Sequence, residues 1–118
     1  MPSEAATTRR WLNDIRYHIE LAQGFIAGIA YEAFRDDLLR FYAVTRCLEI
    51  ISEASRRLPD ETKARHPTIA WKEMAGAGSV YRHNYEDVAV AYVWVTIHDH
   101  LPPPRIAIEH ELSAFGGP

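Results

Sequence analysis

The spacing of apolar residues near the start of the chain constrains the fold more than any other feature. These residues recur at intervals of three and four positions: Leu12, Ile15, Ile19, Ala22 and Ile26. Such spacing places them along one stripe of a helix, and it is typical of helices that pack in an antiparallel bundle. Thr7 and Thr8 precede the stripe and are predicted to cap this helix, while Gly24 and Gly28 weaken its end.

The rest of the chain also has helical patterns. The longest helix is expected over residues 31–58, where apolar residues cover about half of the circumference, so this helix needs more than one neighbour. A short turn of helix follows Pro59, and later helices are expected over these ranges: 69–83 with Thr68 as its cap, 88–101 with Asp87 as its cap, and 105–115 after a stiff break at Pro102, Pro103 and Pro104. The sequence therefore predicts an all-α fold, a bundle of four main helices with one or two short ones, in a single domain over residues 1–118.

Composition argues against several classes of protein. The chain has 118 residues and a single cysteine, Cys47, which cannot form an internal disulfide, and its start lacks the apolar stretch of a secretory signal. No apolar run is long enough to span a bilayer, so a cytoplasmic location without membrane contact is expected. Cys47 is expected to be a small buried residue rather than a nucleophile. The formal net charge of −3 argues against a non-specific nucleic-acid binder, but it leaves room for a nuclease whose positive charge is local.

One short segment gathers the groups that phosphodiester chemistry needs. Tyr81, Arg82, His83, Asn84 and Tyr85 follow one another where the third long helical pattern stops. An imidazole can move a proton near pH 7, a guanidinium can hold a phosphate, and a phenol can donate a hydrogen bond to it. Because His83 and Tyr85 are two residues apart, they face one pocket only if the helix ends between them. Asn84 tolerates the left-handed conformation of such an end.

The same segment also has a purely structural interpretation. Arg82 and His83 suit the negative end of a helix dipole, so Arg82, His83 and Asn84 can equally form a helix C-cap with no catalytic role. Other candidates for chemistry are weaker. His98 and His100 point apart on a helix and do not predict a metal pair. No glycine-rich phosphate loop or serine nucleophile motif occurs, and neither a metal nor a cofactor is expected.

A charged edge on the helix expected over residues 31–58 is open to two interpretations. Arg46, Glu49, Glu53 and Arg56 follow one another at intervals of three and four positions. Such a row is usually a solvated ridge of ion pairs, each worth about 0.3 kcal/mol. The alternative is a polar wall beside an active-site cleft, to which Arg46 and Glu49 would contribute.

The order of several segments resembles the HepT-like branch of the HEPN superfamily over roughly residues 9–115. The segments that carry the resemblance are 48–54 (LEIISEA), 67–71 (PTIAW), 74–76 (MAG), 83–85 (HNY), 93–94 (VW) and 101–102 (LP). The resemblance implies a four-helix-bundle homodimer that cleaves RNA without a metal, in a cleft between the protomers. It also implies a toxin of a two-gene toxin–antitoxin module. The implied partner is a small nucleotidyltransferase antitoxin that silences the toxin by attaching AMP to the motif tyrosine.

The family motif is an arginine, then four to six residues, then histidine, one residue and tyrosine. By this resemblance His83 is the catalytic histidine and Tyr85 is the tyrosine that receives AMP. The arginine at the commonest spacing falls at Gly78, which departs from the family pattern. Arg82 lies four residues further on, one turn later on the same helix face, so we hypothesise that it replaces the missing arginine.

Two functions remain open at this point. The first is a metal-independent endoribonuclease toxin, in which His83 takes a proton from a ribose 2′-hydroxyl while Arg82 and Tyr85 contact the phosphate. The second is a catalytically inactive HEPN-like dimer that binds a nucleotidyltransferase or a nucleotide. Gly78 and the acidic net charge favour the second, whereas the retained Arg82, His83 and Tyr85 favour the first.

Overall fold

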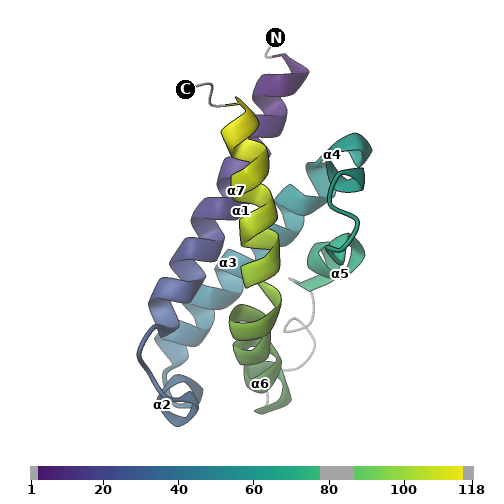
Figure 1. Cartoon of the computed structure of the whole chain (residues 1–118). Helices are drawn as coiled ribbons and strands as arrows, with labels where there is room; N and C mark the ends of the chain where they lie inside the picture. Colours follow the sequence, from purple (N-terminus) through teal and green to yellow (C-terminus); the bar gives the residue numbers. More distant parts are fainter. Residues whose placement is uncertain (1–2, 78–86, 116–118) are drawn as a thin grey trace.

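The computed structural model describes residues 3–77 and 87–115 (Figure 1). Its helices, in chain order, are α1 (Glu4–Ile26), α2 (Tyr31–Arg35), α3 (Leu38–Arg57), α4 (Asp60–Ala64), α5 (Trp71–Gly76), α6 (Asp87–Val95), the π-helical turn η2 (Thr96–His100) and α7 (Pro102–Phe115). These two ranges contain no strand, which confirms the predicted all-α fold.

The long helices lie against one another. α1 packs along α3 and also along α7, and α6 with η2 continues the line of α7 (Figure 1). The start of α1 and the end of α7 lie at one end of the molecule, while α2 and α6 lie at the other. α5 packs against α3 on the side away from α2. Of the described helices, none combines the length and the apolar character needed to cross a membrane.

α1 carries the apolar stripe that the sequence predicts. Leu12, Ile15, Ile19 and Ala22 are completely buried along its length. The helix begins earlier than expected, because the Ser3 side chain accepts a hydrogen bond from the backbone N–H of Ala6 at 3.0 Å and so caps it. The predicted cap at Thr7 or Thr8 is therefore wrong, and Thr8 is instead buried against the core. The helix ends at Ile26, and Gly28 follows with a φ of 76°, a backbone conformation that favours glycine.

The continuous helix predicted over residues 31–58 is interrupted between α2 and α3, so that prediction is wrong. Asp37 is the N-cap of α3, and its carboxylate accepts hydrogen bonds from the Arg40 backbone N–H at 3.0 Å and from the Arg40 guanidinium at 2.6 Å. These bonds, with the backbone N–H first among them, hold the pKa of Asp37 below its ordinary value. The apolar pattern conceals the break because Phe34 and Phe41 are buried on either side of it.

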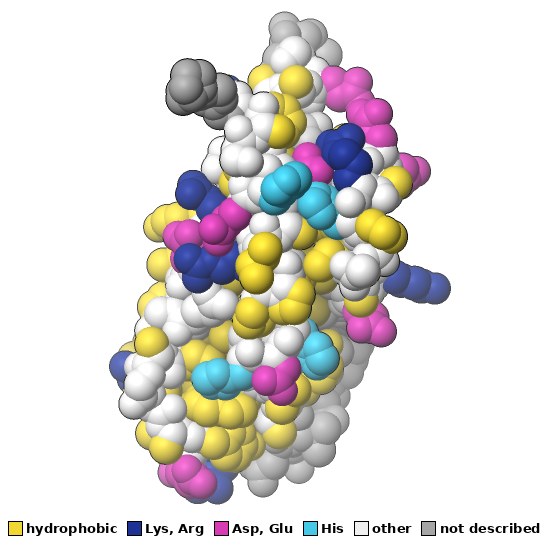
Figure 2. Space-filling model, in the orientation of Figure 1, with side chains coloured by type: hydrophobic (Ala, Val, Ile, Leu, Met, Phe, Trp, Pro, Cys, Tyr) yellow, Lys and Arg dark blue, Asp and Glu magenta, His cyan; other side chains and the backbone are white. Residues whose placement is uncertain are grey.

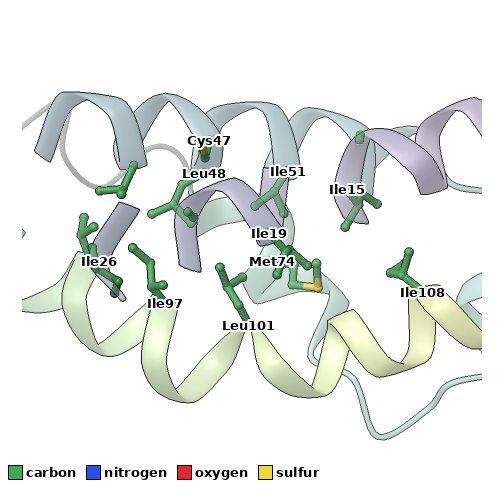
Figure 3. Packing of buried hydrophobic residues seen from close by; sticks show 14 of the residues in the cluster. Ile15, Ile19, Ile26, Cys47, Leu48, Ile51, Met74, Ile97, Leu101 and Ile108 are labelled. Atoms are coloured by element: carbon green, nitrogen blue, oxygen red, sulfur yellow. The ribbon is translucent and has the colours of Figure 1, made fainter. Parts of the chain in front are cut away.

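One hydrophobic core joins α1, α3 and α7 with α5, α6 and η2. Figure 3 shows isoleucines of α1 facing Leu48 and Ile51 of α3, with Ile97, Leu101 and Ile108 closing the cluster from η2 and α7. Cys47 lies among these residues with 4% of its surface exposed. Burial raises the pKa of its thiol to about 11. The prediction that Cys47 is a buried apolar residue is confirmed, since such a thiol is not ionised near neutral pH.

The two short helices that follow α3 are α4, whose position agrees with the prediction, and α5, whose start does not. α4 lies where a turn of helix was predicted after Pro59. α5 begins at Trp71, directly after Ala70, so the predicted cap at Thr68 is wrong. The helix predicted over residues 69–83 is described only as far as Ala77. The remainder of that prediction lies outside the described residues.

The helix predicted over residues 88–101 is present, but a π-helical turn ends it. The backbone N–H of Leu101 donates to the Thr96 carbonyl at 3.0 Å, which is the i→i−5 bond of such a turn. Two buried residues, Ile97 and Leu101, hold this part of the chain against the core. Asp99 and His100 lie between these two residues in the chain and are exposed, beside α5 and the start of α7.

The predicted break at Pro102, Pro103 and Pro104 is also wrong, because all three residues belong to the first turn of α7. Proline lacks a backbone N–H, but the first turn of a helix has no intrahelical acceptor for these groups in any case. The first residue able to donate is Arg105, and its N–H bonds to the Leu101 carbonyl at 3.0 Å. α7 therefore starts three residues before the predicted position.

Candidate functional site

The predicted catalytic segment connects α5 to α6. Arg82, His83 and Tyr85 lie within residues 78–86, outside the described residues, as does Gly78. The predicted convergence of His83 and Tyr85 on one pocket is therefore still a prediction. The structure does describe the helices on both sides of the segment and the contacts that hold them.

α5 is fixed by side chains that bind backbone carbonyls. The buried hydroxyl of Ser52 donates to the Met74 carbonyl at 2.9 Å, and the Arg56 guanidinium donates to the Ala75 carbonyl at 2.6 Å. These two bonds tie the last turn of α5 to α3. At the other end of the helix, the indole N–H of Trp71 is shared between the carbonyls of Lys63 and His66, both at 3.1 Å. The chain therefore enters the catalytic segment from a helix that is anchored at both ends.

α6 is fixed by apolar and aromatic contacts. Ala89 and Val93 are completely buried. The ring of Trp94 lies 5.4 Å from that of Phe34 and 5.6 Å from that of Tyr31, the second in an edge-on arrangement. Aromatic pairs at these distances contribute about 1 kcal/mol beyond the burial of their area. The short helix α2 thus supports the helix that follows the predicted catalytic segment.

The charged edge of α3 forms the ion pairs of the simpler interpretation. Arg46 lies 3.6 Å from Glu49, and Glu53 binds both Arg56 at 2.7 Å and Arg57 at 2.9 Å. The two guanidinium groups hold the pKa of Glu53 below its ordinary value, mainly through hydrogen bonds. The row is an ion-paired ridge, and a cleft-wall role for Arg46 and Glu49 is still a prediction.

A second polar cluster joins the end of α4 to α7. Glu111 is almost completely buried, and its carboxylate accepts two hydrogen bonds from the Arg65 guanidinium, at 2.8 and 3.0 Å. His66 Nε2 lies 2.8 Å from the same carboxylate, and the ring of His110 lies edge-on to that of His66. Figure 2 shows histidine, acidic and basic side chains gathered on the upper part of this face. The hydrogen bonds from Arg65, followed by that from His66, lower the pKa of Glu111.

This cluster leads to a prediction about stability in acid. The pKa of Glu111 is lowered in the folded protein, so its stabilising contribution is complete above the unfolded value, near 4.5. That contribution is lost as the pH falls from this value through the lower folded pKa. We expect Glu111→Gln to lower the midpoint of thermal unfolding at pH 7 and to flatten its decline between about pH 5 and pH 3.

The control for this prediction is Glu109→Gln, on the same helix. Glu109 is exposed and pairs with Arg105 at 2.8 Å, so its removal should change stability little. Thermal unfolding followed by circular dichroism across this pH range would measure both variants. An unchanged acid profile for Glu111→Gln would show that the buried carboxylate does not govern acid stability.

Sequence reasoning missed Glu111, although a signal for it exists. Pro104, Ala107, Ile108 and Glu111 occupy positions i, i+3, i+4 and i+7 and share the buried face of α7. A glutamate on such a face requires a cationic or hydrogen-bonding partner, which sequence spacing alone cannot identify. Among the described residues, no group of three or more His, Cys, Asp or Glu side chains is arranged to hold a metal ion.

Comparison with known proteins adds to this description. The family model for HepT-like ribonucleases matches residues 15–111. A protein named as a probable ribonuclease HepT from Thermococcus cleftensis is 40% identical over 92 residues, which cover 78% of this chain and 84% of that protein. A protein named as a candidate RNase from Caldanaerobacter subterraneus is 35% identical, over 81% of this chain and 86% of that protein. A further candidate RNase, from Methanocaldococcus jannaschii, is 33% identical over 92% of this chain and 90% of its own. No solved structure matches the chain significantly. The extent of the family match and the identity to these relatives show that the chain belongs to the HepT-like ribonuclease family.

Proposed function

We propose that this protein is a metal-independent endoribonuclease, the toxin of a type VII-like toxin–antitoxin pair. The observation that carries the proposal is the family match over residues 15–111, which includes His83 and Tyr85 at the motif spacing. The anchored ends of α5 and α6 support it, because a catalytic segment needs rigid flanks to hold its groups in position.

The proposed reaction is an internal transfer of the phosphodiester. Neutral His83 removes the proton from a ribose 2′-hydroxyl, whose oxygen then attacks the adjacent phosphorus. The bond from phosphorus to the 5′-oxygen breaks, leaving a 2′,3′-cyclic phosphate on one fragment. The departing 5′-oxygen takes a proton from a protonated His83 of the partner subunit, which is why a homodimer is proposed. Arg82 stabilises the charge on the phosphoryl oxygens, and Tyr85 donates a hydrogen bond to one of them.

Regulation is proposed to act on the same segment. A small nucleotidyltransferase antitoxin would transfer AMP to the Tyr85 hydroxyl and release pyrophosphate from ATP. The added nucleotide would place a bulky anion beside His83 and exclude the RNA phosphate. Purified nucleotidyltransferase from the neighbouring gene, incubated with ATP and this protein, should raise its mass by one AMP, and Tyr85→Phe should prevent that change.

The test of the ribonuclease itself is cleavage of RNA by purified protein in the presence of EDTA. We expect cleavage to continue, with 2′,3′-cyclic phosphate and 5′-hydroxyl ends identified by mass spectrometry. His83→Ala protein purified in the same way is the control for contaminating nucleases. Loss of activity in EDTA with recovery on adding Mg²⁺ would contradict the metal-independent mechanism.

A second function is favoured by two observations: the glycine at position 78, where the family motif has an arginine, and the acidic net charge of −3. In this alternative the protein is an inactive dimer that binds a nucleotidyltransferase or a nucleotide. It predicts that wild type and His83→Ala are equally inactive on RNA, while the complex with the nucleotidyltransferase still forms in size-exclusion chromatography.

A further inference from the structure

A cavity opens between α3, α5, η2 and the start of α7. Its volume is about 500 Å³. Its apolar lining includes Leu48 and Ile51 of α3, Met74 of α5 and Leu101. Figure 2 shows apolar surface in the middle of this face, with histidine and acidic side chains along its lower edge. The cavity is large enough for a nucleobase with its ribose.

Two acidic side chains and one histidine, His100, are the groups that can carry a charge near neutral pH among the described residues that line the cavity. Glu73 of α5 and Asp99 of η2 are both exposed and both line it, and no Lys or Arg does so among the described residues. Within the described part of the chain neither carboxylate has an ion-pair or hydrogen-bond partner, and a carboxylate can accept several hydrogen bonds. The two carboxylates therefore suit a ligand that presents N–H donors.

The shape and position of the cavity narrow the choice of ligand further. The apolar lining, which includes Tyr92, suits a ligand with a flat ring. A flexible side chain that ends in an ammonium group also presents N–H donors, but it has no ring to place against this lining. Gly76 and Ala77 also line the cavity, and they directly precede the segment that carries His83. A base bound here would thus lie next to the nucleotide whose phosphate reacts.

We infer that this cavity binds an unpaired guanine base of the RNA substrate. Guanine presents adjacent N1–H and N2–H donors on its Watson–Crick edge, and a carboxylate can accept both at once. Cytosine and adenine present one amino group next to an acceptor, and uracil presents one N–H. Glu73 or Asp99 accepts from the guanine edge while the ring lies against the apolar lining. This inference rests on the proposed function and adds to it a preference for cleavage beside guanine.

The first test measures the sequence preference of cleavage in a pool of single-stranded oligoribonucleotides. Wild type should cut beside guanine in preference to the other bases, and Glu73→Gln and Asp99→Asn should together reduce that preference by roughly tenfold. Glu32→Gln and Asp60→Asn are matched controls, since both residues are exposed and lie outside the cavity lining. A preference that is unchanged by the cavity substitutions would overturn the inference.

The second test does not depend on catalysis. Isothermal titration with GMP and with UMP compares two bases that carry the same sugar and phosphate. Wild type should bind GMP more tightly, and Glu73→Gln with Asp99→Asn should remove the difference while circular dichroism shows a folded protein. Guanine binding without RNA cleavage would refute the proposed ribonuclease but not the cavity. Equal binding of the two nucleotides would overturn the inference. A change of oligomeric mass caused by the cavity substitutions would also overturn it and would identify the cavity as a protein contact.

Discussion

Replacing His83 by alanine should lower the rate of RNA cleavage by roughly 10²–10⁴-fold, the range that a positioned acid–base group contributes. If His83 of each subunit acts on the same phosphodiester, one as base and one as acid, the loss should lie at the upper end of this range. Single-turnover cleavage of a labelled oligoribonucleotide, with enzyme in excess, would measure the chemical step directly.

The control for this prediction is His98→Ala. His98 is exposed on η2, and its ring lies 4.3 Å from that of Trp94, so its loss removes an imidazole that is not part of residues 78–86. Cleavage should continue in that variant. Equal rates for wild type and His83→Ala would place the nuclease activity elsewhere, either at another site or in a contaminant.

The same assay separates the role of Arg82 from that of His83. If Arg82 replaces the arginine missing at Gly78, Arg82→Ala removes one charged contact to the transition state. Cleavage should then slow by roughly 10²-fold. Gly78→Arg would then restore part of the rate in the Arg82→Ala background. Full activity of Arg82→Ala would refute the substitution hypothesis while leaving the role of His83 intact.

The largest effect on stability is expected for Phe34→Ala. Phe34 is completely buried, and its ring lies 5.4 Å from that of Trp94 and 6.3 Å from that of Phe41. Deleting a buried phenylalanine side chain removes its transfer free energy and leaves a cavity, at a cost of about 3–5 kcal/mol. Because α2 has five residues and depends on this side chain, we expect α2 to detach first. Urea unfolding monitored by circular dichroism would measure the loss of unfolding free energy.

Leu39→Ala is the control for that measurement. Leu39 lies on the neighbouring helix but is 83% exposed, so its truncation should change the unfolding free energy by less than about 0.5 kcal/mol. A cost below about 1 kcal/mol for Phe34→Ala would show that α2 contributes little packing to the core.

The apolar periodicity predicted the elements that bury a face, and those predictions held. The stripe from Leu12 to Ile26 and the broad face that contains Cys47 and Leu48 are both buried as expected. Such patterns are informative because burial of one helix face imposes the spacing of three and four directly on the sequence. The all-α fold follows from them.

The predictions that failed concern single polar residues or prolines, whose role depends on the residues that surround them in the folded protein. Asp37 ends one helix and starts another through its bond to Arg40, while the apolar pattern continues across the break. Prolines were expected to interrupt the chain at 102–104, but they occupy the one turn of a helix that needs no N–H donors. The partnership of Glu111 with Arg65 joins residues 46 positions apart, and local spacing carries no information about it. The residues proposed for catalysis rest on motif resemblance rather than on spacing.

The proline-rich start of α7 has an effect on the electrostatics of the cavity. The beginning of a helix usually attracts anions, because its free N–H groups point outward with the positive end of the dipole. Here Pro103 and Pro104 line the cavity, and neither they nor Pro102 has an amide hydrogen to offer. A negatively charged group near this helix start would therefore find no backbone donor among these residues. In the proposed mechanism the reacting phosphate would then depend on Arg82, since the start of α7 offers an anion no backbone donor.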